Sequence, residues 1–251
     1  SEENGKGAKM MCNQGVTEGV DGAFAMHIWS EVDAGKISVE PGPRMANTDW
    51  FRIDIHGTSC HGAMPQRGAD AEIVNALQTI VSREISPYEP AVVTVGEIHG
   101  GTARNVIAGS AYLTGTVRTY SDTAHEMMPE LIKRIVTHTA MALGADAELT
   151  DYTVANVKVE NEAASSERAR AALVKVLGEE AVGRYRGTLS GEDFSAYLQH
   201  VPGMLAFVGC RNPQIGATFA QHSCFYKVDE SVLAKGSMLA AQYAVDFLAE
   251  D

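Results

Sequence analysis

The sequence of 251 residues is poor in cysteine and in long apolar runs, and each shortage excludes a class of protein. Its four cysteines, Cys12, Cys60, Cys210 and Cys224, form no Cys-x-x-Cys pair, so neither a zinc ribbon nor a thioredoxin-type centre is expected. A chain of this size can build a core without a disulfide framework, and we therefore expect reduced thiols in a cytoplasmic protein. No run reaches the roughly 18 apolar residues that a membrane-spanning helix needs.

Basic residues are scarce relative to acidic ones. Lysine and arginine number 20 against 32 aspartates and glutamates, which gives a formal net charge of −12. A chain this acidic is not a general binder of the phosphate backbone, so we expect no nucleic-acid partner. The first residues lack the apolar stretch of a signal peptide, and we expect no membrane partner. With 45% hydrophobic residues, the composition is that of a globular protein with a sizeable core.

Two common catalytic motifs are also missing. The loop at 100–105 is rich in glycine, but no Gly-Lys-Ser/Thr follows, so a phosphate loop is a weak interpretation. Ser190 lies outside the Gly-x-Ser-x-Gly pattern of many serine hydrolases. We expect the neighbouring Glu192 and Asp193 to lie in the first turn of a helix, where acidic side chains are favourable.

Apolar periodicity predicts an α/β domain that carries an insertion. Residues 45–157 give the order β-α-β-β-α-β of a ferredoxin-like, or split βαβ, unit: strand 50–56, helix 70–83, strands 91–98 and 111–118, helix 122–143 and strand 147–154. The flanking stretches, 1–44 and 158–251, are each too small to fold alone, so we expect them to form one domain together. Their predicted elements are helix 7–13, strand 23–29, helix 167–177, strand 204–209 and helix 232–249.

Several residues of catalytic type have ordinary structural interpretations when each is taken alone. Glu2 and Glu3 are compatible with a solvated acidic end. His27 lies in an apolar run, where a histidine is more often a hydrogen-bonded core residue than a ligand. His61 belongs to a polar loop whose histidine and cysteine spacing fits no standard zinc knuckle. His222 is uninformative by itself.

Taken together, these segments resemble the dinuclear-metal amidohydrolases and exopeptidases. That family includes hippurate hydrolase, N-acyl-amino-acid amidohydrolase, the indole-acetyl-amino-acid hydrolases and carboxypeptidase G. Seven motifs follow the family's order, from near the start of the chain to its last helix. They are Glu2-Glu-x-x-x-Gly-Ala8, Met26-His-Ile-Trp29, His61-Gly-Ala-Met-Pro65 with Gly68 and Asp70, Gly101-Thr-Ala-x-Asn-Val-Ile107, Gly115-Thr-Val-Arg118, Gly191-Glu-Asp-Phe194, and His222-Ser with Phe225.

The resemblance implies metal-dependent hydrolysis of the amide bond of N-acyl amino acids such as hippurate. Two divalent metal ions (Zn, Mn, Co or Ni) would share a bridging water and activate it. Metal ligands are implied at Glu3, His27 and His222. Glu2 is implied as the general base, because a carboxylate near that water can take its proton and pass it to the leaving amine.

The resemblance also assigns the insertion to the family's lid and dimerisation domain, so we expect a homodimer. His61 would stabilise the tetrahedral intermediate, usually in the site of the partner subunit. Asn105 corresponds to a lid residue near the substrate, and Arg118 to a position that could hold a substrate carboxylate.

The family carries a further N-terminal segment with another metal ligand and the bridging ligand. Since this sequence begins at the Glu-Glu pair, we expect the metallopeptidase-type catalytic domain to be incomplete at its N-terminus. One alternative is therefore a catalytically inactive or half-metallated fragment that acts as a dimerising scaffold. A second alternative is a metal-storage or sensor module built on Glu3, His27 and His222.

Overall fold

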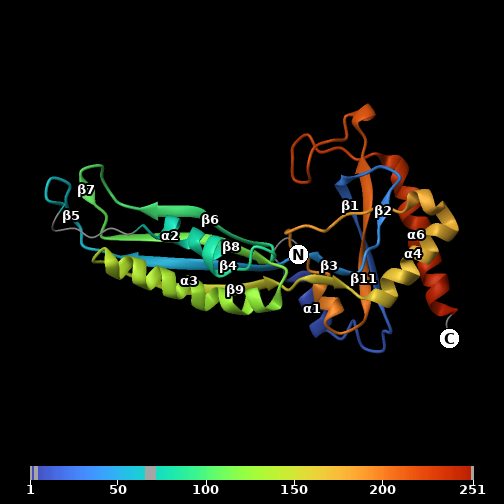
Figure 1. The fold of residues 1–251 in the computed structure, drawn as a ribbon, viewed down its shortest axis with the longest axis horizontal. Coiled ribbons are helices and arrows are strands. Elements are labelled where there is room, and N and C mark those ends of the chain that lie inside the picture. The colour runs from blue at the N-terminus through green and yellow to red at the C-terminus, as the bar shows by residue number, and fades with distance from the viewer. Residues whose placement is uncertain (1, 3–4, 66–71, 250–251) are drawn as a thin grey trace. The chain divides into compact units, whose positions relative to one another are not determined.

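The computed structural model describes residues 2, 5–65 and 72–249. The chain divides into two compact units, and the second is inserted in the sequence of the first (Figure 1). The flanking unit comprises residues 1–45, 159–188 and 192–251, and the inserted unit comprises residues 46–158 and 189–191. All four cysteines are free. None of the helices in the described ranges is long and apolar enough to cross a membrane.

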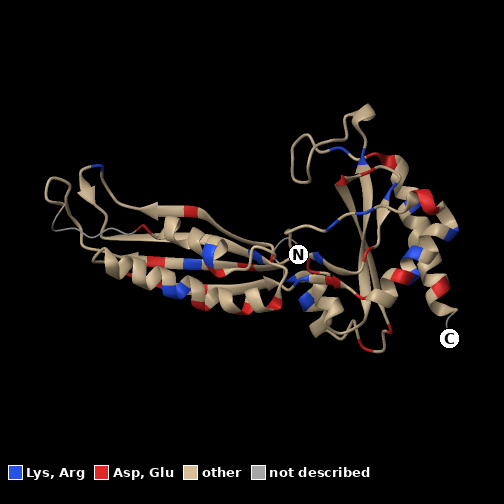
Figure 2. Ribbon diagram, in the orientation of Figure 1, with Lys and Arg blue, Asp and Glu red and all other residues tan. Residues whose placement is uncertain are grey.

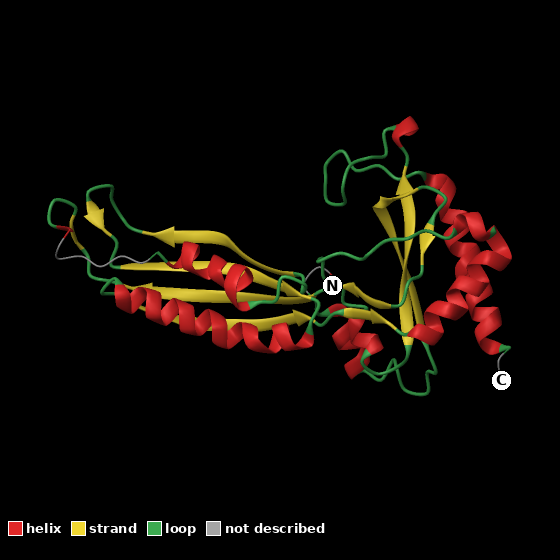
Figure 3. Cartoon of the chain, in the orientation of Figure 1, coloured by secondary structure: helices red, strands yellow, loops and turns green. Residues whose placement is uncertain are grey.

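The flanking unit is built on a three-stranded sheet in the order β1 (Ala23–Asp33), β11 (Gly203–Arg211) and β2 (Ile37–Ser38). β1 and β11 are parallel, and β2 is antiparallel to β11. Helices α4 (Ala163–Leu177) and α6 (Leu233–Leu248) cover one face of the sheet (Figure 3). β11 is buried along almost its whole length, which explains its nearly continuous apolar sequence.

Shorter elements complete the flanking unit. Single turns of 3-10 helix lie at 179–181, 213–215 and 230–232. β3 (Gly42–Met45) pairs antiparallel with β10 (Val159–Asn161). α1 (Gly7–Asn13) packs against α5 (Ser195–Leu198), and a hydrogen bond from the backbone N–H of Ala8 to Asp193 Oδ2, 2.8 Å long, reinforces this contact.

The inserted unit is a four-stranded antiparallel sheet with helices on one face. Its strand order is β6 (Ala91–Gly100), β8 (Ser110–Thr119), β4 (Asn47–His56) and β9 (Asp146–Asn156). The helices are α2 (Ile73–Thr79), which continues as a π-helical turn over 80–84, and α3 (Asp122–Ala142). A two-stranded ribbon of β5 (Cys60–His61) and β7 (Val106–Ile107) extends beyond the sheet.

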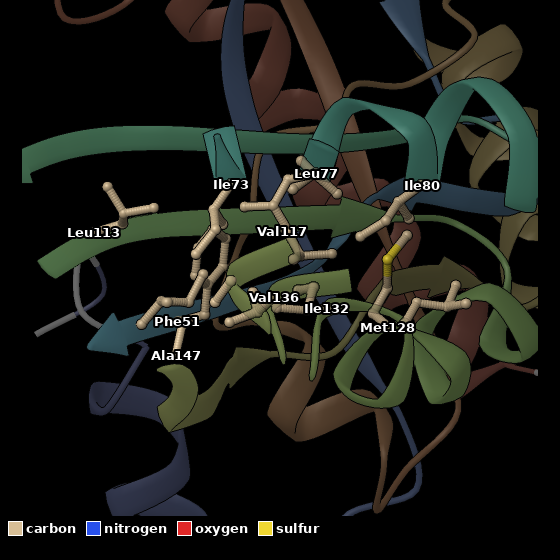
Figure 4. Packing of buried hydrophobic residues seen from close by; sticks show 14 of the residues in the cluster. Phe51, Ile73, Leu77, Ile80, Leu113, Val117, Met128, Ile132, Val136 and Ala147 are labelled. Carbon is tan, nitrogen blue, oxygen red and sulfur yellow. The ribbon is translucent and has the colours of Figure 1, made fainter. Parts of the chain in front are cut away.

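One apolar core joins the sheet and the helices of the inserted unit. Phe51, Leu113 and Val117 point from the sheet toward Leu77 and Ile132 of the helices, and all of them are buried (Figure 4). Intervening residues of β4, such as Arg52 and Asp54, form an ion pair on the opposite face. The alternation that predicted these strands from sequence is the consequence of this one-sided burial.

The predicted order β-α-β-β-α-β is confirmed, and so is the helix at Gly7–Asn13. The expectation for Glu192 and Asp193 is wrong, because α5 begins only at Ser195. Asp193 binds the N–H of Ala8, and Glu192 Oε1 accepts a hydrogen bond from Phe194 N at 3.2 Å. The predicted helix at 70–83 is observed from Ile73, and its first two residues lie outside the described ranges.

A buried carboxylate connects α3 to the sheet of the inserted unit. The Asp49 side chain is fully buried and accepts hydrogen bonds from His125 Nε2 at 3.0 Å and from the Tyr152 hydroxyl at 2.6 Å. The bond to Asp49 raises the pKa of His125 above its ordinary 6.5, against the effect of burial, and the nearby Asp122 and Glu126 act in the same direction as Asp49. Protonated His125 is therefore the form that stabilises the folded unit.

We expect the inserted unit to lose stability as pH rises. Because the pKa of His125 is raised on folding, its contribution is complete below about pH 6.5 and is lost as pH passes the folded-state value. Denaturant unfolding between pH 5 and 9 can be followed by Trp50 fluorescence in a Trp29→Phe background, since the chain has two tryptophans. His125→Gln should remove much of the pH dependence, whereas His138→Gln, at an exposed position of α3, should keep it. An unchanged slope in His125→Gln would contradict the assignment.

Candidate active site

The candidate residues of the flanking unit come from separate segments of the chain. Glu2 belongs to the N-terminal segment, His27 to β1, and His222 to the loop that follows β11. Glu3 lies outside the described residues, so nothing is stated about its position. Because these segments are far apart in the sequence, the hydrogen bonds between segments determine where each candidate side chain lies.

His27 is held by a neighbouring backbone carbonyl. Its Nδ1 lies 2.8 Å from the carbonyl oxygen of Ile28, and its ring lies edge-on to the ring of Trp29 with centroids 5.2 Å apart. A carbonyl oxygen can only accept a hydrogen bond, so the Nδ1 of His27 must carry the proton. The Nε2 of a neutral imidazole is then left with a lone pair, which is the arrangement that a metal ligand requires.

The same carbonyl oxygen positions the loop that carries His222. The Gln221 Nε2 donates to Ile28 O at 3.1 Å, and the Ser30 hydroxyl donates to Gln221 Oε1 at 2.7 Å. His222 itself is exposed and has a backbone φ of +64°, a left-handed conformation that is uncommon for a residue with a side chain. Gln221 therefore connects the loop to β1 at the residue next to His27.

The N-terminal segment is tied to the turn before α5. Glu2 is exposed, and its carbonyl oxygen accepts a hydrogen bond from Gly5 N at 2.7 Å. Further along this segment, the N–H of Ala8 donates a hydrogen bond to the buried Asp193. The start of the chain, α1 and the turn at 192–194 are thus one connected structure.

Glu192 is a partly buried carboxylate of the flanking unit that the sequence reasoning interpreted as part of a helix start. Its carboxyl group is half-buried, and burial raises its pKa. The N–H of Phe194, which donates to Glu192 Oε1 at 3.2 Å, opposes that rise. Its position in the Gly191-Glu-Asp-Phe194 motif was the signal in the sequence that could have identified it.

Within residues 2, 5–65 and 72–249, no three His, Cys, Asp or Glu side chains form a ready metal cage. The donor chemistry nevertheless fits a borderline divalent ion. Imidazole nitrogens from His27 and His222, together with carboxylates, are the ligands that zinc and its neighbours accept. The bond from His27 Nδ1 to Ile28 O, which leaves the lone pair on Nε2 of the neutral ring, is the structural observation that supports this fit.

His61 and Asn105 are brought together in the inserted unit. They lie on the β5–β7 ribbon and the turn that leads into it, where Gly62 N donates to Asn105 O at 2.7 Å. The backbone N–H of Ala63 donates to His61 Nδ1 at 3.1 Å, so a neutral His61 carries its proton on Nε2. The exposed His61 ring can therefore donate a hydrogen bond.

Arg118 lies on β8, at the end of the four-stranded sheet that is remote from the β5–β7 ribbon. Its Nη1 donates to Thr48 Oγ1 at 2.7 Å, and burial lowers its pKa although Asp49 opposes this effect. β4 pairs with β8 so that Thr48 faces Arg118 and His56 faces Ser110. The two pairs are eight positions apart (118 − 110 = 8), which corresponds to about 26 Å along the strand. Arg118 is thus remote from the β5–β7 ribbon of its own chain.

Comparison with known proteins relates this architecture to a family. Residues 46–143 match the peptidase dimerisation domain of the M20 type. The thermostable carboxypeptidase 2 of Saccharolobus solfataricus is 34% identical over 98% of this chain and 64% of its own length. The N-acetylcysteine deacetylase of Bacillus subtilis is 33% identical, again over 98% of this chain and 64% of its own length.

A solved structure extends the similarity to the fold. The YXEP protein of Bacillus subtilis, described as a dinuclear metal binding peptidase, is 29% identical with a TM-score of 0.80, over 99% of this chain and 63% of that one. The fold is the one shared by amidohydrolases and metallopeptidases of this type. Within that class, the chain belongs to the M20 family, and the resemblance of its motifs is confirmed. The chain spans just under two thirds of the length of these relatives.

We expect Asp193 to stabilise the N-terminal segment. Asp193→Ala would leave the buried N–H of Ala8 without its acceptor, at a cost of about 1–3 kcal/mol. Hydrogen–deuterium exchange should therefore become faster in residues 7–13 and stay unchanged in β11. Asp193→Asn should restore part of the protection, because its amide oxygen can accept the bond. Asp21→Ala, at an exposed position, is the control, and unchanged exchange of residues 7–13 in Asp193→Ala would disprove the expectation.

Proposed function

We propose that the full-length protein hydrolyses the amide bond of N-acyl amino acids. The observation that carries this proposal is the shared carbonyl of Ile28, which binds His27 and also connects the His222 loop to β1. The N-acetylcysteine deacetylase among the relatives supports the class of substrate. In the reaction, a water oxygen bonds to the acyl carbon and the C–N bond breaks, which gives a carboxylic acid and a free amino acid.

We propose that the imidazoles of two histidines contribute metal ligands. His27 and His222, with Glu3 from the sequence motif alone, would hold divalent ions of the Zn, Mn, Co or Ni type, which supply Lewis-acid activation of the carbonyl and a water of lowered pKa when bound.

The protein's own side chains would carry the protons. Glu2 takes the proton of the attacking water and delivers it to the nitrogen of the leaving amine. The Nε2–H of His61 donates to the oxygen that becomes negative in the tetrahedral intermediate, an interaction worth about 3 kcal/mol in comparable sites. Asn105, whose backbone pairs with the His61 segment, would contact the substrate beside it.

The separation of His61 and Arg118 favours sites that are shared between subunits. Arg118 lies about 26 Å along the strands from the His56–Ser110 pair, and His61 lies on the β5–β7 ribbon, which follows that end of the sheet. One small N-acyl amino acid cannot reach both in the same chain. If both contact substrate, each site takes His61 from one subunit and Arg118, as the group for the substrate carboxylate, from the other.

We expect the full-length protein, loaded with Mn²⁺, Co²⁺, Ni²⁺ or Zn²⁺, to hydrolyse N-acetyl or N-benzoyl amino acids. Glu2→Gln should lower kcat by about 10²- to 10⁴-fold and leave the bound metal unchanged, because it removes the general base but no ligand. His27→Ala should instead lower the bound metal, as measured by elemental analysis. Glu18→Gln, an exposed glutamate of the same N-terminal stretch, serves as the control. A metal-loaded dimer without turnover on a broad panel would favour the scaffold alternative.

We further propose that the partner is a second copy, bound along the free edge of β6. This strand carries one charged residue, Glu97, and Ile98 beside it is 63% exposed (Figure 2). The opposite edge strand, β9, carries the exposed acidic residues Asp146, Glu148 and Asp151, which discourage strand pairing. Two β6 strands related by a two-fold axis would pair antiparallel and join the two sheets into one.

Sedimentation velocity is expected to show a dimer that depends on β6. Ile98→Lys places a charge on the proposed edge and should raise the dimer dissociation constant by about tenfold or more. Asp151→Lys changes a side chain on the opposite edge and should leave the dimer intact. A monomeric wild-type protein, or dissociation by Asp151→Lys alone, would rule out the β6 interface.

A further inference from the structure

The guanidinium of Arg118 is held by a hydroxyl group inside the inserted unit. Its Nη1 donates to Thr48 Oγ1 at 2.7 Å, a short distance that is typical of a hydrogen bond from a charged donor. Arg118 is half-buried, whereas Thr48 is only 3% exposed. The bond therefore joins a long charged side chain to a buried acceptor, on neighbouring strands where the two residues face each other.

The sheet fixes the position of this hydroxyl. Thr48 lies on β4, a central strand that pairs with β8 at Arg118 and with β9 at Asn156. The threonine side chain is branched at Cβ, so few χ1 rotamers are available to it. An arginine side chain has several rotatable bonds and is ordered only where its partners hold it. Thr48 is thus the rigid member of the pair.

A third residue, Gly191, covers the bond. The segment 189–191 belongs to the inserted unit, so this contact lies within that unit. A Cβ on Gly191 would lie 2.4 Å from Thr48 Oγ1 and 3.3 Å from Arg118 Nη1. A side chain at this position would displace the hydroxyl, and only the backbone of a glycine can lie against both ends of the bond.

The bond to Thr48 orients a group that recognises planar anions. A guanidinium presents several N–H donors in a planar fork, and Thr48 occupies one of them, at Nη1. Carboxylates bind such a fork through two parallel hydrogen bonds, which require a defined orientation of its plane. A guanidinium that is already oriented loses less conformational freedom when the carboxylate binds.

We propose that Thr48 is a positioning residue for Arg118 and that Gly191 keeps its hydroxyl in place. The pair thereby makes the enzyme prefer N-acyl amino acids with a free carboxylate to the corresponding neutral amides. This inference rests on the proposed function, in which Arg118 binds the substrate carboxylate. Thr48 acts through Arg118 and touches no reacting atom.

Selectivity for the carboxylate is the kinetic test. The full-length metal-loaded protein is assayed with N-acetylmethionine, and N-acetylmethionine amide is measured as a competitive inhibitor whether or not it is turned over. Thr48→Val removes the acceptor and should raise KM for the acid about tenfold, because the guanidinium loses its orientation. The kcat should stay within about twofold, since the carboxylate is bound equally in the ground state and the transition state. The inhibition constant of the amide should stay within about twofold.

Two further variants test the geometry of the bond. Thr48→Ser keeps the hydroxyl and should return KM to within about threefold of the wild-type value. Gly191→Ala places a methyl group against the hydroxyl and should raise KM for the acid as Thr48→Val does. Because both changes break the same bond, their effects should not add in the double variant.

Thr116→Val is the matched control. Thr116 lies on the same strand as Arg118, and its Oγ1 donates to the carbonyl oxygen of Asp49 at 2.9 Å. The variant removes one hydroxyl bond of the same sheet and leaves the bond between Arg118 and Thr48 in place. Its KM for the acid should equal that of the wild type.

A purely structural role for Thr48 would give a different result. Equal weakening of the acid and the amide in Thr48→Val, with a lowered Tm, would overturn the proposal. A Thr48→Ser variant that is as impaired as Thr48→Val, in a protein of wild-type Tm, would overturn it as well, because the hydroxyl would then have no role.

A spectroscopic measurement separates the inference from the proposed activity. In ¹H–¹⁵N NMR spectra of the full-length protein, a guanidinium held by a hydrogen bond shows separate Nη signals, whereas a rotating one shows an averaged signal. The Arg118 signals are assigned by their loss in Arg118→Lys. Separate signals in the wild type and in Thr116→Val, averaged in Thr48→Val, support the positioning role even in a protein without turnover. Averaged signals in the wild type, or unchanged signals in Thr48→Val, overturn it whatever the activity.

Discussion

The carbonyl oxygen of Ile28 is the point on which the candidate site depends. It accepts hydrogen bonds from His27 Nδ1 and from Gln221 Nε2, two side chains that are 194 positions apart (221 − 27). One oxygen thereby sets the tautomer of His27 and the position of the loop that carries His222. β1 can supply this acceptor because the strand is held in register by its parallel partner β11.

The rest of the flanking site is assembled around that strand by buried polar contacts. Asp193 binds the N-terminal segment, and the carboxyl group of its neighbour Glu192 is half-buried. Both residues belong to a turn that the sequence presents as a helix start. Asp193 instead accepts a hydrogen bond from α1, because the buried N–H of Ala8 needs an acceptor.

Rigid strands impose a different constraint in the inserted unit. The antiparallel register of β4 and β8 fixes Arg118 at one end of the four-stranded sheet, and the β5–β7 ribbon that carries His61 lies beyond the other end. Close packing explains another residue of the family motifs. A side chain at Gly115 would place its Cβ 2.3 Å from Phe51 Cζ and 2.3 Å from Thr94 O, so only glycine fits between the aromatic core and β6. The buried Asp49 then fixes α3 on that core.

The sequence by itself determined the long elements and the family. α3, β6 and β8 have enough residues to display a helical or alternating period, and their predicted bounds agree with the structure to within a few residues. The β5–β7 ribbon and β2 have two residues each, too few for any period, so the sequence could not reveal them. The motifs likewise identified Glu2, His27, His61 and His222 as residues of interest without placing them.

Only the tertiary structure decided how those residues can act. The role of Gln221 and the separation of Arg118 from the β5–β7 ribbon arise from contacts between residues far apart in the chain. Such contacts leave no local pattern, because a side chain's partner is chosen by strand register and loop closure and not by its neighbours in sequence. The ring contact of Phe219 and Phe225, with centroids 5.3 Å apart, is of the same kind, because the fold of their loop creates it.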